Sequence, residues 1–379
     1  MPVIPKLVLD TFCEVYDLLK SRAHAEFWDF ATHDIVPGAV YLVGRHQFEA
    51  NVSRIIELVN SDTCRIILSN PAEGSETLIG PMVRYGIHNM VLSGKILIIG
   101  GGDMESCYPF IRYDSFLPKI LDYEENLQEI QCAQGIFQNV NKPYKFLFLN
   151  GRLRLHRKYL LERFDLVGLL DQGLWTHLDS MSCVNSAIKM MANGQDLMLG
   201  PREIHYLPPE YEVPRYRSQL CKKSEDSFAK YDLFNKEWGE IYLYAAPYVD
   251  TYFSIVTETV FTYPYSFRTE KIWKPIAMGH PWICVANRGY YKDMKNLGFR
   301  TFSSIIDESF DTIDDNQKRI ERIAAVVEDL CGSDLPAFLK AAEPVCKYNQ
   351  QHLAEMRPRV RKEFPERFFQ FLRQHQWMT

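Results

Sequence analysis

The predicted fold of this chain depends on three segments, YFSIVTET (252–259), FRTEKIWKPIAMGHP (267–281) and WICVA (282–286). The first and third are apolar and rich in β-branched or aromatic residues, as is typical of buried strands. The second begins near a Thr-Glu-Lys triplet and reaches Gly279, which predicts a helix with a glycine at its end. Strand, loop, helix and strand in this order predict a parallel sheet with helical crossovers.

The start of this helix, at Thr269-Glu270-Lys271, is a candidate anion site. The first N–H groups of a helix have no partner within it and carry the positive end of the helix dipole. At that point, Glu270 and Lys271 are suited to hold a ribose diol and a diphosphate. In the alternative interpretation, Thr269 only caps the helix and the two charges are solvated. Binding is favoured because ligands of parallel sheets collect where a strand turns into a helix.

A locally basic turn follows the apolar strand predicted over 144–149. Its sequence is NGRLRLHRK (150–158), with three arginines, a histidine and a lysine in an acidic protein. The planar guanidinium groups of Arg154 and Arg157 match phosphate oxygens. Residues 154, 157 and 158 share one helical face, which also fits a helix with a solvated basic side. We favour phosphate binding at the carboxyl end of this strand.

Length and composition indicate the class of protein. The 379 residues exceed one ordinary core, so two domains are expected. The chain is 46% hydrophobic and 24% charged, as in soluble globular proteins, and its net charge of -5 does not indicate nucleic-acid binding. No apolar run approaches the ~18 residues of a transmembrane span, and the start lacks a signal-peptide layout. Nine scattered cysteines without a CxxC pair indicate reduced thiols, a cytoplasmic location and no zinc site.

Strands and helices are predicted to alternate along most of the chain, which is typical of an α/β fold. Two Rossmann-like domains facing a cleft are expected, because ligands bind at the carboxyl ends of parallel strands. The predicted parts are 1–34 (N-terminal helical extension), 35–143 (first α/β domain), 144–345 (second α/β domain) and 346–379 (C-terminal helical tail). The predicted strands are 40–43, 64–68, 89–92, 95–99, 144–149, 241–244, 252–257 and 282–286. The predicted helices are 8–31, 48–59, 77–85, 155–164, much of 288–346, and 348–377.

Three side chains at predicted strand ends of the first domain are candidate general bases. His46 follows the first strand, Glu73 follows the second, and Asp103 follows a Gly-Gly-Gly turn after a later strand. A general base must lie within hydrogen-bond reach of the hydroxyl that it deprotonates, and the sequence does not show which of the three does. Each of them is also explained as a surface charge or a helix cap.

Several cofactor and nucleophile motifs are missing from the sequence. The turn at Gly100–Gly102 lacks the G-x-G-x-x-G spacing of dinucleotide-binding folds, which disfavours a nicotinamide-dependent oxidoreductase. The sequence has no P-loop, no H-E-x-x-H and no G-x-S-x-G, and no D-x-D stands alone at a strand end. The sequence therefore predicts neither a metal site nor a bound cofactor.

The basic turn and the Thr-Glu-Lys helix start together resemble the donor-binding half of GT-B glycosyltransferases, in particular the bacterial α1,3-fucosyltransferase type. That family has a strand that ends in Asn and an Arg seven residues later, like Asn150 and Arg157 here. It then has a strand that leads into a Glu-containing loop and a Thr-Glu-Lys helix start, like Glu258 and residues 269–271 here. The intervening loop differs from the family's glycine-rich turn, since this chain has FTYPYS at 261–266.

The resemblance implies a GT-B fold and transfer of a sugar from a GDP- or UDP-linked donor to an acceptor hydroxyl. It also implies inversion at the anomeric carbon and no required metal. Residues 144–345 would bind the donor, and 35–143 would bind a glycan, a lipid-linked saccharide or a protein acceptor. Glu270 would bind the ribose hydroxyls, and Lys271 and Arg157 the diphosphate.

The same family uses a Glu after an early strand of the acceptor domain as its general base, and Glu73 lies in a comparable place. The alternative function is a non-catalytic module with a degenerate GT-B cleft, which binds a nucleotide or a protein partner. Residues 152–158 would then form a surface for an acidic partner. Binding of nucleotide sugars without turnover would distinguish this module from the enzyme.

Overall fold

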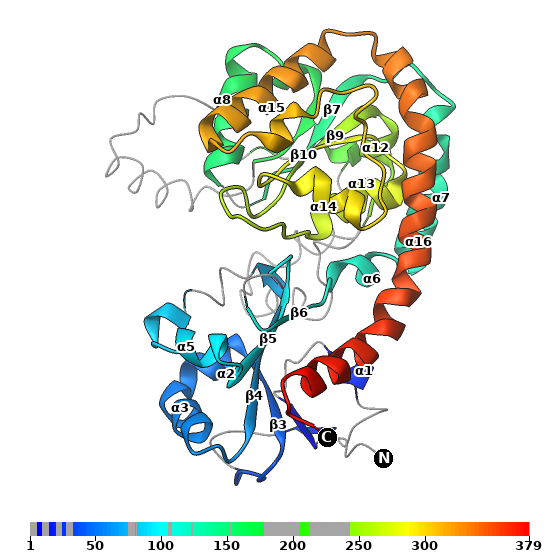
Figure 1. The fold of residues 1–379 in the computed structure, drawn as a ribbon. Helices are drawn as coiled ribbons and strands as arrows, with labels where there is room; N and C mark the ends of the chain where they lie inside the picture. Colours follow the sequence, from blue (N-terminus) through cyan, green and yellow to red (C-terminus); the bar gives the residue numbers. More distant parts are fainter. Residues whose placement is uncertain are drawn as a thin grey trace, which may run out of the picture. The chain divides into compact units, whose positions relative to one another are not determined.

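The chain forms two compact units, each with its own parallel sheet (Figure 1). Unit 1 is Met1–Pro118 together with Glu355–Thr379, and unit 2 is Lys119–Ala354. Both units alternate strands with helices, so the predicted α/β class with parallel sheets is confirmed. This computed structural model describes residues 6–9, 15–19, 25–27, 33–74, 80, 82–104, 108–122, 124–151, 154–177, 205, 207–211 and 243–378.

The described strands of unit 1 form a sheet in the order β2-β1-β3-β4-β5-β6, and every neighbouring pair is parallel. These strands are β1 (Leu7–Leu9), β2 (Ala25–Phe27), β3 (Val40–Gly44), β4 (Arg65–Gly74), β5 (Ile96–Gly101) and β6 (Phe110–Arg112). The accompanying helices are α1 (Tyr16–Leu19), α2 (Arg45–Ala50), α3 (Val52–Asn60), α5 (His88–Leu92) and α6 (Phe116–Ile120).

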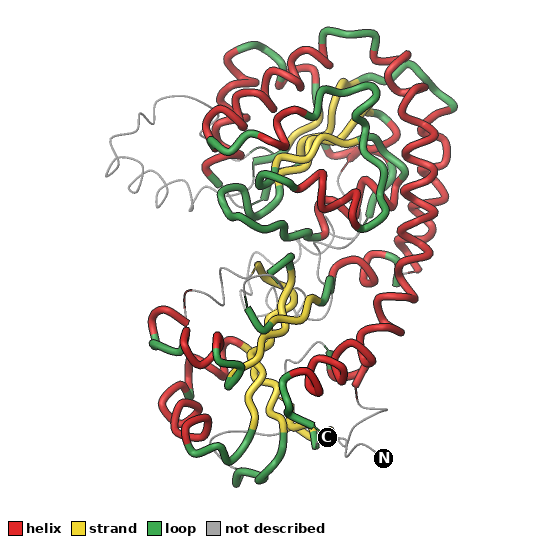
Figure 2. Tube along the Cα trace, in the orientation of Figure 1, coloured by secondary structure: helices red, strands yellow, loops and turns green. Residues whose placement is uncertain are grey.

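Different helices cover the two faces of this sheet. Helices α2, α3 and α5 lie on one side of it, and the end of α16 (Leu335–Gln374) lies on the other (Figures 1 and 2). Successive residues of a strand point to opposite faces. Accordingly, Leu97 and Ile99 of β5 pack with α16, and the intervening Ile98 is buried outside that cluster. The sheet is therefore covered on both sides, as parallel sheets are.

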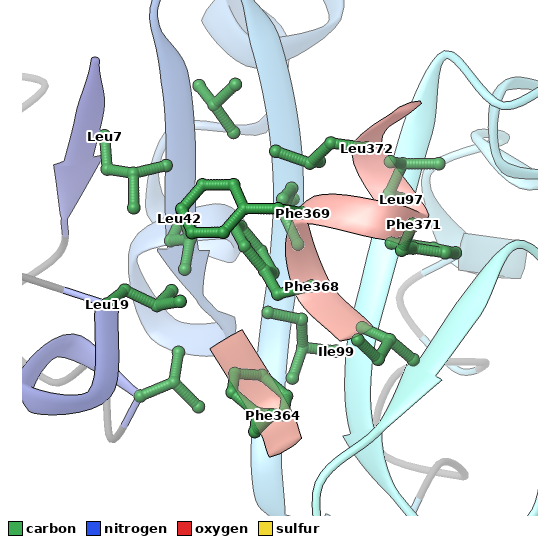
Figure 3. Close-up of a cluster of buried hydrophobic side chains, with 14 of the residues drawn as sticks. Leu7, Leu19, Leu42, Leu97, Ile99, Phe364, Phe368, Phe369, Phe371 and Leu372 are labelled. Atoms are coloured by element: carbon green, nitrogen blue, oxygen red, sulfur yellow. The ribbon is translucent and has the colours of Figure 1, made fainter. Parts of the chain in front are cut away.

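Aromatic side chains of α16 build the core on their side of the sheet. Figure 3 shows Phe364, Phe368 and Phe369 against Leu42 of β3 and Ile99 of β5. The helix predicted over 348–377 is thus confirmed, and its last part belongs to the core of unit 1. Among the described helices, α16 included, none combines the length and the apolar character that a membrane span needs.

The helix predicted over 8–31 is wrong. Leu7–Leu9 and Ala25–Phe27 are strands that extend the sheet beyond β3, with the short helix α1 between them. Leu9 belongs to β1 and Leu19 to α1, so the apolar residues whose spacing predicts one helix are divided between a strand and a short helix. Pairing with the exposed edge of β3 outweighs the local pattern.

Two predicted strands also differ from the structure. The run at 89–92 lies in helix α5, between Gly86 and Gly94, whose φ angles are 69° and 72°. Glycines in the left-handed conformation readily flank a short helix. In addition, an apolar run of four residues does not distinguish a helix from a strand. In the segment predicted as a strand at 241–244, the described residues 243 and 244 are not in a strand, and the rest lies outside the described residues.

The described strands of unit 2 form a parallel sheet in the order β10-β9-β7-β8. These strands are β7 (Tyr144–Phe148), β8 (Leu174–Trp175), β9 (Thr251–Thr257) and β10 (Trp282–Val285). The helices are α7 (Glu124–Cys132), α8 (Leu155–Leu166), α12 (Ala246–Val249), α13 (Glu270–Met278), α14 (Tyr290–Asn296), α15 (Asn316–Cys331) and the first part of α16. Short 3-10 turns are η1 (Ala133–Phe137), η2 (Leu170–Gln172), η3 (Pro209–Tyr211) and η5 (Ser309–Thr312).

The units divide at Pro118/Lys119, whereas the sequence places the division at 143. Helix α7 belongs to unit 2 because its polar side chains bind the segment before β9. Asn126 Oδ1 accepts from the Leu243 N–H at 2.8 Å, and Glu129 Oε2 accepts from the Ala245 N–H at 2.7 Å. The coil at 139–143 therefore lies inside unit 2.

Replacing Phe368 tests the place of α16 in unit 1. Phe368→Ala should lower the free energy of unfolding of this unit by about 3–5 kcal/mol, because it removes a fully buried ring and leaves a cavity. Amide hydrogen exchange of β3, β4 and β5 in increasing denaturant measures the change. Gln370→Ala, at an exposed position of the same helix, should change it by less than about 0.5 kcal/mol. Equal effects of the two variants would contradict this packing.

Candidate functional site

The carboxyl ends of the described strands of unit 2 meet at one edge of the sheet, because all of these strands are parallel. Two helices begin at that edge, since α8 follows β7 and α13 follows β9. Such edges are where parallel sheets bind ligands, and helix starts there favour anions. The polar side chains at this edge are therefore the candidate ligand contacts of unit 2.

Asn150, a predicted donor ligand, joins the ends of three strands. Its backbone N–H donates to Thr176 Oγ1 at 2.8 Å, and Thr176 Oγ1 donates to the Asn150 carbonyl at 3.0 Å. Its side-chain Oδ1 accepts from Thr257 Oγ1 at 3.0 Å. Asn150 is buried, so its role in this structure is to align β7, β8 and β9 at the edge.

The first turn of α8 binds the end of β9. His156 Nε2 lies 2.9 Å from the carbonyl oxygen of Glu258. Since a carbonyl oxygen only accepts, Nε2 carries the proton of this ring. Arg157 Nη2 donates to the carbonyl of Thr257 at 2.9 Å and to that of Glu258 at 3.4 Å. These contacts satisfy backbone groups at the strand end and set α8 against β9.

Burial determines the charge of these two side chains. Burial and the neighbouring Arg157 lower the pKa of His156 to about 3, so its ring is neutral at physiological pH. Burial and Arg154 lower the pKa of Arg157 to about 10, and Glu258 and Glu270 oppose that shift. Arg157 therefore stays protonated. With 3% of the residue exposed, its charge acts on the edge from beneath the surface.

Glu258 is a fully buried carboxylate that holds the start of α13. Its Oε1 accepts from the Thr269 N–H at 3.0 Å and from the Tyr290 hydroxyl at 3.1 Å, and its Oε2 accepts from Thr269 Oγ1 at 2.7 Å. Burial raises the pKa of Glu258, although Lys271 and the hydrogen bonds from Thr269 oppose the shift. The residue is 0% exposed, so this predicted donor ligand supports the helix start from inside the protein.

The helix start predicted at Thr269-Glu270-Lys271 is confirmed. Thr269 caps α13, and its Oγ1 accepts from the Lys271 N–H at 3.3 Å. Lys271 Nζ lies 2.8 Å from Glu270 Oε1 and 3.1 Å from Thr269 Oγ1. Burial opposes the ionisation of Glu270, but Lys271 and Lys274 outweigh it and lower the pKa of that carboxyl. The helix start therefore carries an ionised carboxylate bound to an ammonium group.

The structure brings the two predicted halves of the site together. Arg157 interacts electrostatically with Glu270, and the charge of Lys271 disfavours protonation of His156, so the start of α8 lies near that of α13. Arg154 is the N-cap residue of α8 and is exposed, and 26% of the Lys271 side chain is exposed. Two cations therefore reach solvent at this edge, with a third beneath them.

The three candidate bases of unit 1 lie in or just after β3, β4 and β5, which are parallel neighbours. His46 is exposed in α2, just past the end of β3. Glu73 lies in β4, and its side chain is outside the described residues. Asp103 follows β5 and forms an ion pair with Arg112. Their role as bases stays a prediction. Among the residues that the structure describes, no group of three or more His, Cys, Asp and Glu residues is placed to hold a metal.

Sequence reasoning missed three side chains that support the site, namely Tyr290, Phe261 and Arg319. Tyr290 donates to the buried carboxylate after β9. The Phe261 ring stacks on that of His156 with 5.2 Å between centroids, and the Arg319 guanidinium carbon lies 4.4 Å from the centre of the Phe261 ring. These contacts join distant parts of the chain, and a local pattern does not show them. The one available signal is Gly289, which marks a turn after β10 and hence the start of α14.

The pH dependence of stability tests the burial of Glu258. A carboxyl with a raised pKa binds its proton more tightly in the folded state, so stability falls as pH rises from the ordinary value of 4.5 through the raised one. Glu258→Gln removes this ionisation, so the unfolding midpoint of unit 2 should fall less with pH than in the wild type. Urea unfolding at a series of pH values measures this midpoint.

The matched control for this experiment is Asp165→Asn, an exposed carboxyl in α8 of the same unit. This variant should keep the pH dependence of the wild type. An identical pH dependence in Glu258→Gln and the wild type would contradict the buried, destabilised carboxylate.

Comparisons with protein-family models, with curated proteins and with solved structures find no match for this chain. What the site does must therefore be argued from its own geometry and charge.

Proposed function

We propose that this chain is an inverting glycosyltransferase that uses a nucleoside-diphosphate sugar, GDP- or UDP-linked, as its donor. The observation that carries the proposal is the meeting of two helix starts at the ends of the neighbouring strands β7 and β9, with Arg154, Arg157 and Lys271 around them. Two helix dipoles and three cations at one sheet edge suit a diphosphate. The proposed enzyme is of the GT-B type, and unit 2 is assigned to bind the donor.

Exposure separates the cations that touch the phosphates from the cation that supports them in this proposal. Arg154 and Lys271 make the direct phosphate contacts, because their side chains reach solvent. Lys271 exchanges its contact with Glu270 for a phosphate oxygen, and the Glu270 carboxylate then accepts hydrogen bonds from the ribose hydroxyls. Arg157 adds its charge from the buried layer. The support for these groups comes from Asn150, Glu258 and Thr269.

The proposed reaction exchanges one C–O bond for another. An acceptor hydroxyl loses its proton to a general base of unit 1, and its oxygen attacks the anomeric carbon on the face opposite the diphosphate. The bond from that carbon to the phosphate oxygen breaks, and the nucleoside diphosphate leaves with the electron pair. The configuration inverts because attack and departure use opposite faces. The cations stabilise the negative charge that develops on the leaving group, so the reaction does not require a metal.

Nucleotide binding tests the donor site. Arg154→Ala should raise the Kd of GDP or UDP about 10- to 100-fold, because a hydrogen bond to a charged group contributes ~1.5–3 kcal/mol. It should also weaken the binding of inorganic pyrophosphate. Glu270→Ala should weaken the binding of the nucleotides but not that of pyrophosphate, because the proposed contact of Glu270 is with the ribose. Isothermal titration calorimetry measures all three ligands.

Arg54→Ala is the control for these variants, since Arg54 is an exposed arginine on α3 of unit 1. It should bind like the wild type. If both site variants also bind GDP and UDP like the wild type, the donor site is assigned to the wrong edge.

Transfer assays test the general base. One of Glu73→Gln, Asp103→Asn and His46→Ala should lower the transfer rate by about 10²–10⁴-fold, because a positioned base contributes a factor of this size. The Kd of the nucleotide should not change. The assay follows nucleoside-diphosphate release from a panel of nucleotide sugars with and without acceptors, in the presence of a chelator. Full activity in all three variants would exclude these candidates, and activity that returns only with manganese would contradict metal independence.

One observation favours the second candidate function, a nucleotide- or partner-binding module without catalysis. The Asp103 carboxylate is held by Arg112, which also contacts Asp114 at 3.2 Å. This carboxylate is therefore already engaged in an ion pair and does not face an acceptor hydroxyl freely. In this alternative, the exposed start of α8 binds a nucleotide or an acidic partner. Nucleotide-sugar binding without turnover by any acceptor would favour the module.

A further inference from the structure

The loop between β9 and α13 has a three-residue tip that none of the roles above uses. Thr262 and Pro264 are exposed and Tyr263 is half-buried, while Phe261 and Tyr265 on either side are buried. An aromatic residue thus stands at a solvent-facing point of the loop that leads from β9 to α13, one of the two helices of the proposed donor site.

The residue before the tip is held firmly. The Phe261 ring stacks on that of His156 with an interplanar angle of 17°. Arg319, which is buried, donates through Nη2 to the Phe261 carbonyl at 2.6 Å and through Nη1 to that of Ile313 at 2.9 Å. Side chain and backbone of Phe261 are therefore both fixed, from α8 on one side and α15 on the other.

The residues after the tip are held as well. Ser266 Oγ donates to Asp293 Oδ2 at 2.6 Å and accepts from Asn287 Nδ2 at 3.2 Å. The ring of the buried Tyr265 lies 5.7 Å from that of Tyr263 between centroids. In addition, the residue before a proline is confined to extended backbone, which restricts Tyr263. The tip is therefore preorganised.

The tip also lies close to the start of α8. Phe261 contacts His156, which belongs to the first turn of α8, two residues from Arg154. Two residues of extended chain span at most ~7 Å, so the backbone of Tyr263 lies within that distance of Phe261. The other end of the loop leads directly into Thr269.

We propose that Tyr263 is a specificity-determining residue whose ring stacks on the nucleobase of the bound nucleoside diphosphate. This inference rests on the proposed function. The cations at the helix starts suit the phosphates, whereas the uncharged Thr-Tyr-Pro tip offers a planar face and no charge. Stacking on an aromatic side chain contributes about 1–3 kcal/mol per base. A ring on a held loop loses little conformational freedom when it binds.

Calorimetry with GDP, UDP and inorganic pyrophosphate tests the proposal on the full chain. Tyr263→Ala should raise the Kd of GDP or UDP about 10-fold and leave that of pyrophosphate unchanged. Tyr263→Trp should retain nucleotide affinity. Tyr263→Leu keeps apolar bulk but lacks the ring, and it decides the question if the alanine variant fails to fold. Tyr348→Ala, which removes a partly exposed tyrosine of α16, should bind all three ligands like the wild type.

The outcomes separate this inference from the function on which it rests. If Tyr263→Leu binds nucleotides like the wild type while Arg154→Ala loses affinity, Tyr263 does not stack on the base and the donor site stands. An equal loss of nucleotide and pyrophosphate affinity in the Tyr263 variants also overturns base stacking, because the ring would then act on the phosphate site. A wild-type chain that binds neither GDP nor UDP overturns both proposals.

Discussion

The carbonyl end of β9 is the constraint on which the arrangement of unit 2 depends. His156 and Arg157 bind its last carbonyl groups, and the carboxylate of Glu258 at the same point binds the cap of α13. Burial without a hydrogen bond would cost each of these polar groups about 1–3 kcal/mol. A shift of either helix by one residue would break several of these bonds together. One strand end therefore positions two helices whose starts are more than 100 residues apart in the sequence.

The edge of the unit 2 sheet has two layers with different tasks. The inner layer consists of buried side chains that bind one another or the backbone, namely Asn150, His156, Arg157 and Glu258. The outer layer consists of Arg154 and Lys271, which reach solvent, and the buried Glu270 is bound to Lys271. Such a division is typical of binding sites, where supporting contacts hold the groups that touch a ligand. In the proposed function, donor binding rearranges the contacts of Lys271 with Glu270 and Thr269.

Much of unit 2 could be predicted because its strands are apolar and its helices begin at recognisable residues. The segment from Thr251 to Val285 forms strand, helix and strand as expected, and Thr269 caps the helix. The roles of the side chains inside the site were harder to predict from the sequence. Arg154 and Arg157 share a helical face, yet one is exposed and the other buried, because β9 covers only the second. The strands near the N-terminus differ from the predicted helix because two three-residue strands are too short to show the alternating pattern of a strand.

Helix α16 has a consequence for the order in which the protein folds during synthesis. Its Phe364, Phe368 and Phe369, together with Phe371 and Leu372, complete a core whose other buried side chains come from the first 113 residues of the chain. A ribosome releases the strands of unit 1 long before it makes these side chains. The α16 face of that sheet must therefore wait, with Leu42 and Ile99 exposed, until α16 has emerged. Unit 2 has all its residues earlier, so unit 1, although it begins the chain, is the last to close. During that interval the exposed apolar strands are where a chaperone would bind, and where aggregation would start.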